Sequence, residues 1–157
     1  MRKVVLGLGN TLNRDEGLGV QALYALEERL GSQAEFELLD GGTLGLNLLP
    51  VVESASHLLL LDATDAGQVP GTLIQLAKEQ IPLYAGVKLS QHQITFQEVL
   101  GLANIRGRLP THLCLIGAQP SDISIGLELS PVVAETMPAI VETALTTLRE
   151  WQVRDTA

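Results

Sequence analysis

The sequence predicts an α/β protein, a three-layer α/β/α sandwich around a twisted, mostly parallel five-stranded sheet. Three observations carry this prediction. Short apolar runs alternate along the chain with longer segments of helical periodicity. The first run, KVVLGL, is continuously apolar, as expected for a strand buried on both faces of a parallel sheet. The chain of 157 residues suits a single domain, 1–157, with a substantial core.

The first half of the chain predicts three strands and two helices. The strands cover Lys3–Leu8, Glu35–Leu39 and His57–Leu61. The first helix, over about residues 17–30, has leucines on one side and charged residues on the other. Thr43 is a suitable cap for the second helix, over about residues 44–52. Pro50 lies inside that second pattern, so we expect the helix to kink or stop near Leu49.

The second half predicts two more strands and two more helices. They cover Gly71–Leu76, Leu113–Gly117, residues 95–102 and residues 131–153. Only about ten residues separate the third strand from the fourth, which is too few for a parallel crossover. The fourth strand is therefore expected to run antiparallel. Ser130 and Pro131 suit the start of the last helix, and Pro138 should kink it.

The composition argues against several functional classes. The net charge of −8 disfavours nucleic acid and anionic membranes as partners, because both select basic patches. A single cysteine, Cys114, leaves no internal disulfide and no cysteine metal cage, and its apolar strand indicates a small core residue. No apolar run approaches the ~20 residues of a membrane span, and the first ends too early for a signal peptide. These features predict a cytoplasmic protein.

Acidic residues follow the first three strands, at Glu16, Asp40 and Asp62. Neighbouring parallel strands lie only ~5 Å apart, so the loops after them share one crevice. Three carboxylates there would repel one another unless a cation or a shared proton relieved them. Together with His92 they offer nitrogen and oxygen ligands that suit Zn, Ni, Mn or Fe. A site furnished in this way would take its remaining ligands from a substrate.

Each of these residues also has a simpler interpretation. Glu16 and its neighbour Asp15 favour a helix N-terminus, Asp40 before two glycines suits a turn, and a lone loop histidine is usually solvated. The pair Gly7 and Gly9 after a strand could also begin a dinucleotide-binding unit. That reading is disfavoured, because Leu12 occupies the third glycine position and two acids would face the pyrophosphate.

Taken together, the motifs resemble those of the hydrogenase maturation endopeptidases. That family removes a C-terminal extension from the large-subunit precursor of nickel–iron hydrogenases. The matching segments occur in the family's order and span nearly the whole chain: Gly7–Asn10, Asp15–Gly19, Asp40–Thr43, Asp62–Ala63, Pro70–Thr72, Ser90–Gln93 and Gly126–Pro131.

The resemblance implies specific roles for some of these residues. It implies that Glu16, Asp62 and His92 contact a metal, and that Asp40, with the specificity loop of Gly41, Gly42 and Thr43, acts in specificity or catalysis. The fold it implies is a five-stranded sheet with one antiparallel strand. The metal would be nickel supplied by the substrate, although Zn or Cd could occupy the site in vitro.

The resemblance leaves the chemistry open. The metal could polarise the scissile carbonyl or a water, or it could only position the peptide while Asp40 acts as general base. The expected partner is the hydrogenase large-subunit precursor, and the protein is expected to be a monomer that binds neither nucleic acid nor membrane. A metal-binding chaperone that docks on the precursor without cutting it is the alternative function.

Overall fold

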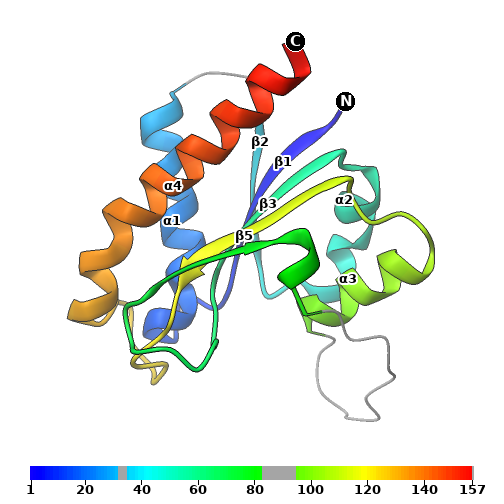
Figure 1. Cartoon of the computed structure of the whole chain (residues 1–157). Coiled ribbons are helices and arrows are strands. Elements are labelled where there is room, and N and C mark those ends of the chain that lie inside the picture. The colour runs from blue at the N-terminus through cyan, green and yellow to red at the C-terminus, as the bar shows by residue number, and fades with distance from the viewer. Residues whose placement is uncertain (32–34, 83–94, 157) are drawn as a thin grey trace.

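The computed structural model describes residues 1–31, 35–82 and 95–156, and it has the predicted fold class (Figure 1). The strands are β1 (Lys3–Leu8), β2 (Glu37–Gly42), β3 (His57–Ala63), β4 (Leu73–Ala77) and β5 (His112–Ala118). They form one sheet in the order β2-β1-β3-β5-β4. All neighbouring strands are parallel except β4, which runs antiparallel to β5. This confirms the mostly parallel sheet and the antiparallel fourth strand.

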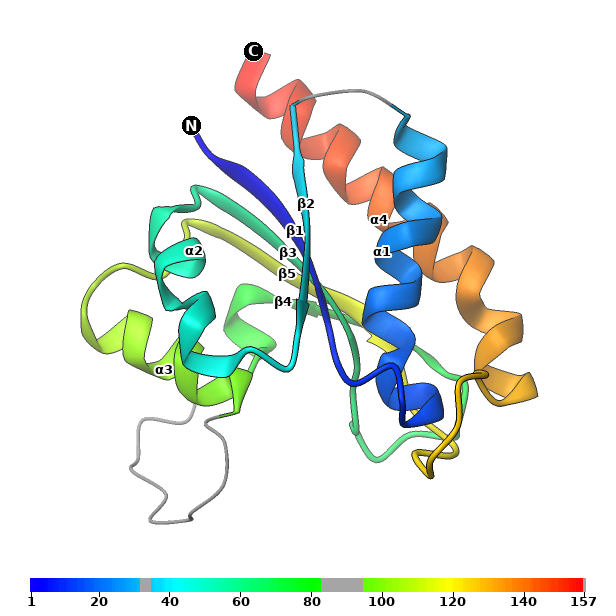
Figure 2. The same ribbon diagram turned by 180° about the vertical axis from the view of Figure 1, so that it is seen from behind.

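Helices cover both faces of this sheet (Figures 1 and 2). The α-helices are α1 (Leu18–Leu30), α2 (Leu49–Ser54), α3 (Phe96–Ile105) and α4 (Pro131–Thr156). Short 3-10 turns are η1 (Arg14–Gly17), η2 (Gly45–Leu48) and η3 (Lys78–Gln80). Helices α1 and α4 lie on one face and α2 and α3 on the other, each against its own buried apolar cluster. No described helix is both long and apolar enough to span a membrane.

Strand β2 differs from its predicted bounds of Glu35–Leu39. It ends at Gly42, so residues expected in a turn are paired with β1 instead, Gly7 opposite Asp40 and Leu8 opposite Gly42. A register shift between Gly7 and Leu8 accommodates the extra residue. At Gly41 an added Cβ would lie 2.9 Å from Leu6 Cδ1, so the glycine allows this close packing. Gly41 and Gly42, which suggest a turn in the sequence, are therefore part of strand β2.

Pro50 lies at the start of a helix instead of at its end. The sequence predicts that Pro50 kinks or stops a helix near Leu49, but regular α-helix begins there, after the 3-10 turn η2. Proline is tolerated in the first turn of a helix because its missing N–H would have no partner inside the helix. Helix α4 begins at Pro131, as predicted, and includes Pro138, where the kink stays a prediction.

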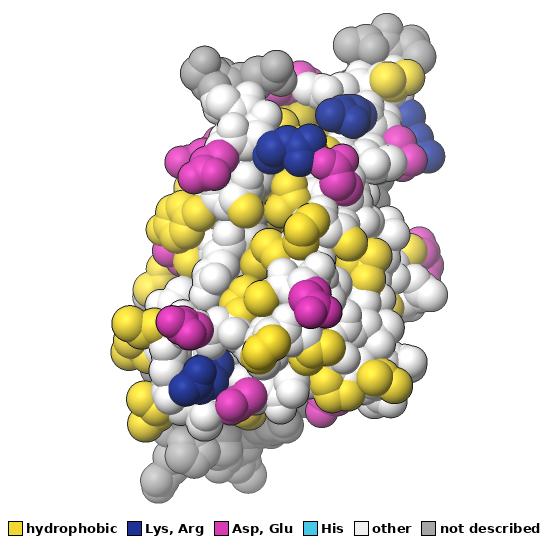
Figure 3. Space-filling view, turned by 90° about the vertical axis from the view of Figure 1, so that its left-hand side faces the viewer, with side chains coloured by type: hydrophobic (Ala, Val, Ile, Leu, Met, Phe, Trp, Pro, Cys, Tyr) yellow, Lys and Arg dark blue, Asp and Glu magenta, His cyan; other side chains and the backbone are white. Residues whose placement is uncertain are grey.

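The surface over α1 and α4 mixes apolar and charged side chains (Figure 3). Beneath it, Cys114 of β5 is buried in the apolar cluster that these helices cover, as predicted for a small core residue. Its burial raises the pKa of the thiol to about 11, so the thiol is protonated at neutral pH. A protonated, buried thiol is a poor nucleophile.

Candidate functional site

The carboxyl ends of β1 and β3 open into a pocket of about 290 Å³. Glu16 of η1 and Asp62 of β3 both line it, so the fold brings together two of the three predicted metal-contacting residues. The other described lining residues come from the ends of β1, β2 and β3, from the residues that follow β1 and β2, including η2, and from the start of α3: Leu8, Gly9, Gly42, Thr43, Gly45, Leu48, Ala63, Thr95 and Phe96. The pocket lies where ligands bind in open parallel sheets.

Glycines place Glu16 beside Asp62. Gly9 has a φ of 117°, and a Cβ there would lie 1.8 Å from the carbonyl oxygen of Glu16. A Cβ on Gly19 would lie 2.0 Å from the carbonyl oxygen of Leu61. Only glycine at these positions allows η1 and the start of α1 to pack this closely on β1 and β3. Gly9 and Gly19 therefore allow Glu16 and Asp62 to lie close together in the pocket.

The electrostatics of the pocket favour a cation. Burial raises the pKa of Asp62 to about 7; a hydrogen bond from the backbone N–H of Ala63 opposes that rise, and the charge of Glu16 adds to it. A half-buried carboxylate with a second acid nearby holds its proton more tightly than in water, or else accepts a compensating positive charge. Two carboxylates in this pocket could therefore contribute oxygen ligands to a divalent metal.

The third predicted ligand, His92, lies outside the described residues, which end at 82 before it and resume at 95 after it. Among the described residues no group of three or more histidines, cysteines, aspartates or glutamates could hold a metal ion. Thr95, three residues after His92 in the sequence, lines the pocket. The complete ligand set of Glu16, Asp62 and His92 stays a prediction.

The predicted specificity segment is divided between two places. Gly42 and Thr43 line the pocket, whereas Asp40 is not among the described lining residues. The exposed Asp40 carboxylate instead accepts a hydrogen bond of 3.0 Å from the Tyr24 hydroxyl on α1. That hydrogen bond raises the pKa of Tyr24. The role of Asp40 as general base stays a prediction, and Tyr24 is the partner that orients its carboxylate.

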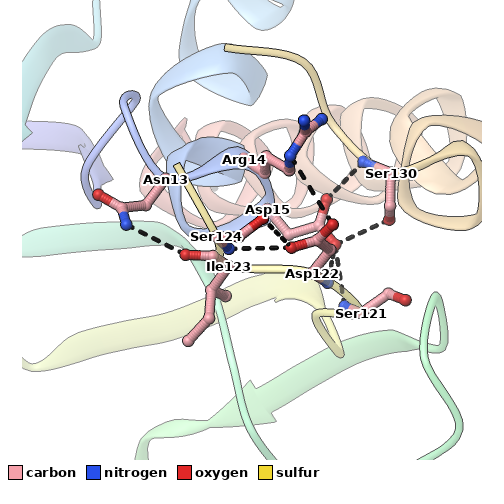
Figure 4. A network of polar contacts seen from close by, with 8 residues as sticks. All are labelled: Asn13, Arg14, Asp15, Ser121, Asp122, Ile123, Ser124 and Ser130. Carbon is pink, nitrogen blue, oxygen red and sulfur yellow. Dashed lines mark hydrogen bonds and ion pairs between the residues drawn. The ribbon is translucent and has the colours of Figure 1, made fainter. Parts of the chain in front are cut away.

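Asp15 has a role that the sequence interpretation did not identify. Its carboxylate is fully buried and accepts four hydrogen bonds from the segment after β5 (Figure 4). The donors are the backbone N–H groups of Ser121, Asp122 and Ser130 at 2.9, 2.9 and 2.7 Å, and the Ser130 hydroxyl at 2.7 Å. Burial alone would raise the pKa of Asp15, but these donors outweigh it and lower that pKa. Asp15 therefore ties η1 to a distant segment instead of lining the pocket.

Gln119 is a second residue that the sequence interpretation missed. Its buried side-chain oxygen accepts hydrogen bonds from the backbone N–H groups of Ala66 and Gln68, at 2.8 and 3.1 Å. Its side-chain nitrogen donates to Asp65 at 3.1 Å. Gln119 thus holds the loop that follows Asp62. A glutamine just after a strand carries no distinctive pattern in the sequence, so only the fold reveals this contact.

A larger cavity, of about 440 Å³, lies elsewhere, between β4, the start of β5 and the end of α4. His112, Cys114 and Trp151 are among its lining residues, and none of the predicted site residues that the structure describes is. It begins at the opposite end of β5 from the acidic pocket, so it is separate from the predicted chemistry.

Known proteins of one family are similar to this chain over most of its length. The hydrogenase maturation protease family matches residues 20–147. A hydrogenase expression/formation protein, HupD of Rhodobacter capsulatus, is 40% identical over 157 residues, covering 99% of this chain and 75% of that protein. The hydrogenase 2 maturation protease of Escherichia coli is 36% identical over 151 residues, covering 96% of this chain and 92% of that protein.

A solved structure shows the same architecture. The hydrogenase maturating endopeptidase HybD from Escherichia coli superposes with a TM-score of 0.85 at 36% identity, covering 96% of this chain and 93% of that one. The matched segment, the curated relatives and this fold agree with one another. This chain belongs to the hydrogenase maturation protease family.

Proposed function

We propose that this protein is the endopeptidase that removes the C-terminal extension from a nickel-loaded hydrogenase large-subunit precursor. The observation that carries the proposal is the meeting of Glu16 and Asp62 in one pocket with Gly42 and Thr43. Family membership supplies the reaction class, because hydrogenase maturation proteases are endopeptidases that act on this precursor. The two acids of the pocket would allow the enzyme to recognise a metal bound to the substrate.

Nickel is part of the substrate in this proposal. Glu16, Asp62 and His92 would contact it, and ligands from the precursor would complete its coordination. The raised pKa of Asp62, about 7, favours this arrangement, because a cation replaces the proton that burial otherwise retains. Zinc or cadmium could occupy the same ligands in vitro. The enzyme would work as a monomer in the cytoplasm.

Asp40 is the proposed general base. Its carboxylate is exposed, and the Tyr24 hydroxyl fixes its direction. A carboxylate held in this way could accept a proton from the attacking water, while nickel bound by the precursor fixes the peptide. If nickel also polarises the scissile carbonyl, Asp40→Asn should retain partial activity, whereas Glu16→Gln should not. Because Glu16→Gln should block the reaction in either case, the residual rate of Asp40→Asn separates the alternatives.

The test is mass spectrometry of a hydrogenase large-subunit precursor incubated with this protein, with and without nickel loading. Loss of one C-terminal peptide from the loaded precursor alone would support both the cleavage and its dependence on nickel. Glu16→Gln, Asp62→Asn and His92→Ala should each block the reaction. Glu135→Gln, an exposed acid on α4, is the matched control and should leave it unchanged.

Each variant is first checked for folding by circular dichroism. Unfolding of all three variants, at Glu16, Asp62 and His92, would instead give these residues a structural role. Stable binding of the loaded precursor without a change in mass would contradict cleavage and favour the metal-binding chaperone.

A further inference from the structure

Two segments far apart in the sequence form a small platform beside the pocket. We call residues 10–15 with residues 121–130 the Asp15 platform. The backbone N–H of Arg14 donates to the Gly126 carbonyl at 3.0 Å, and the N–H of Gly126 donates to the Leu12 carbonyl at 2.9 Å. Asn13 and Gly126 form a parallel β-bridge. These contacts place the loop after β1 directly against the segment after β5.

The platform is held in one conformation. The buried Asp15 carboxylate accepts the four hydrogen bonds described above, and the side-chain amide of Asn13 donates to the Ile123 carbonyl at 3.1 Å (Figure 4). Gln21 of α1 donates to the Leu127 carbonyl at 3.5 Å. A surface that is ordered before it binds loses less conformational entropy on association. The network therefore suits a rigid binding surface.

Large apolar side chains project from this rigid surface. The exposed fractions are 60% for Leu12, 57% for Ile123, 87% for Ile125 and 71% for Leu127. In Figure 4 the Ile123 side chain points away from the polar network. Single exposed apolar residues are normal in proteins, but several on one platform that hydrogen bonds hold in place are typical of an interaction site.

The platform is continuous with the candidate site. Glu16, which lines the pocket, directly follows Asp15 in η1, and Gly9, which also lines it, precedes Asn10. Specific protein interfaces bury roughly 800 Å² per partner, much more than a small pocket can supply. A folded protein substrate must therefore also rest on the surface beside the pocket.

We propose that the Asp15 platform is the surface on which the body of the precursor docks. This inference rests on the proposed function, and it adds the surface on which the folded part of the substrate binds. The partner surface would be an apolar patch with a basic group at its rim, since Glu128 is exposed among the apolar residues of the platform, whereas Asp122 pairs with Arg14 at 3.7 Å. Asp15 is a positioning residue in this scheme, because it orders the platform without touching the substrate.

The test uses the double variant Ile125→Ser/Leu127→Ser in the full chain. We expect the KM for nickel-loaded precursor to rise about tenfold or more, with kcat at saturating precursor within about twofold of wild type. The matched control is Ile105→Ser at the end of α3, whose exposed fraction of 65% is close to the 71% of Leu127. It should leave both constants unchanged. Circular dichroism confirms that each variant is folded.

Binding of the precursor, measured by biolayer interferometry, is read alongside cleavage. Failure of wild type to cut would contradict the proposed function, while the Kd values of wild type and double variant would still test docking. Equal KM and Kd values for wild type and double variant would overturn the docking proposal alone. A double variant that changed only the sedimentation of the free protein would overturn it too, because the platform would then contact a second copy of this chain.

Discussion

Asp15 and Glu16 are neighbours in the sequence, yet the fold gives their carboxylates different surroundings. Asp15 is buried among hydrogen-bond donors, whereas Glu16 lines the pocket beside Asp62. The pKa of Asp15 is lowered by its donors, and the pKa of Asp62 is raised by burial. At the scale of single residues, local surroundings thus separate a structural acid from candidate functional ones.

Asp15→Asn should destabilise the fold by about 2–4 kcal/mol. The amide nitrogen of asparagine would face N–H or O–H donors, and a buried donor without an acceptor is costly. The folded pKa of Asp15 lies below its ordinary value of 3.8, so its carboxylate stabilises the wild type above about pH 4. That contribution is lost as the pH falls through the folded pKa.

Urea unfolding of wild type and Asp15→Asn between pH 3 and pH 7 measures this difference. It should shrink at the acid end. A difference in unfolding free energy that stayed constant down to pH 3 would contradict the role of the Asp15 charge.

Asp62→Asn should have the opposite pH dependence. The folded pKa of Asp62 is about 7, whereas its ordinary value is 3.8. The free energy of unfolding of the wild type therefore falls as the pH rises from about 4 to about 7, and this carboxyl changes it no further above about pH 7. The asparagine variant lacks this loss. Its stability relative to wild type should therefore improve by about 1 kcal/mol or more between pH 5 and pH 8. Parallel pH profiles of the two proteins in urea unfolding would refute the raised pKa.

At the scale of elements, close packing of η1 on the end of β1 builds the pocket. Gly9→Ala should cost about 2–4 kcal/mol, because the new Cβ would meet the Glu16 carbonyl oxygen and the residue would keep a φ of 117°. Gly67→Ala is the matched control: its φ is also positive, at 69°, but nothing lies within 4 Å of an added Cβ. It should cost only about 1 kcal/mol. Thermal or urea unfolding measures both, and equal costs would show that backbone conformation alone requires Gly9.

At the scale of the whole molecule, charge should govern how fast the precursor associates. The net charge of −8 predicts a partner with a basic surface, and salt screens such attraction beyond about 10 Å at 0.1 M. The association rate measured by stopped flow should fall as NaCl is raised from about 50 to about 500 mM. The loss of affinity in Ile125→Ser/Leu127→Ser should change little over that range, since apolar contacts are not screened. A salt-independent association rate would exclude electrostatic steering.

The sequence by itself determined the fold class, the antiparallel fourth strand and the acids that follow the strands. These features rest on local periodicity and on the lengths of connections, which a single chain displays directly. The sequence also predicted that Cys114 is buried, because its neighbours in the strand are apolar.

Only the tertiary structure decided which acids share a pocket. Strand order brings the ends of β1 and β3 together, and contacts between residues more than a hundred positions apart in sequence bury Asp15 within the platform. Pairing with β1 draws Asp40 and Gly42 into a strand, so that Asp40 meets Tyr24 while Gly42 lines the pocket. The physical reason is common to all three: burial, pairing and pKa depend on neighbours in space, and local sequence does not specify those neighbours.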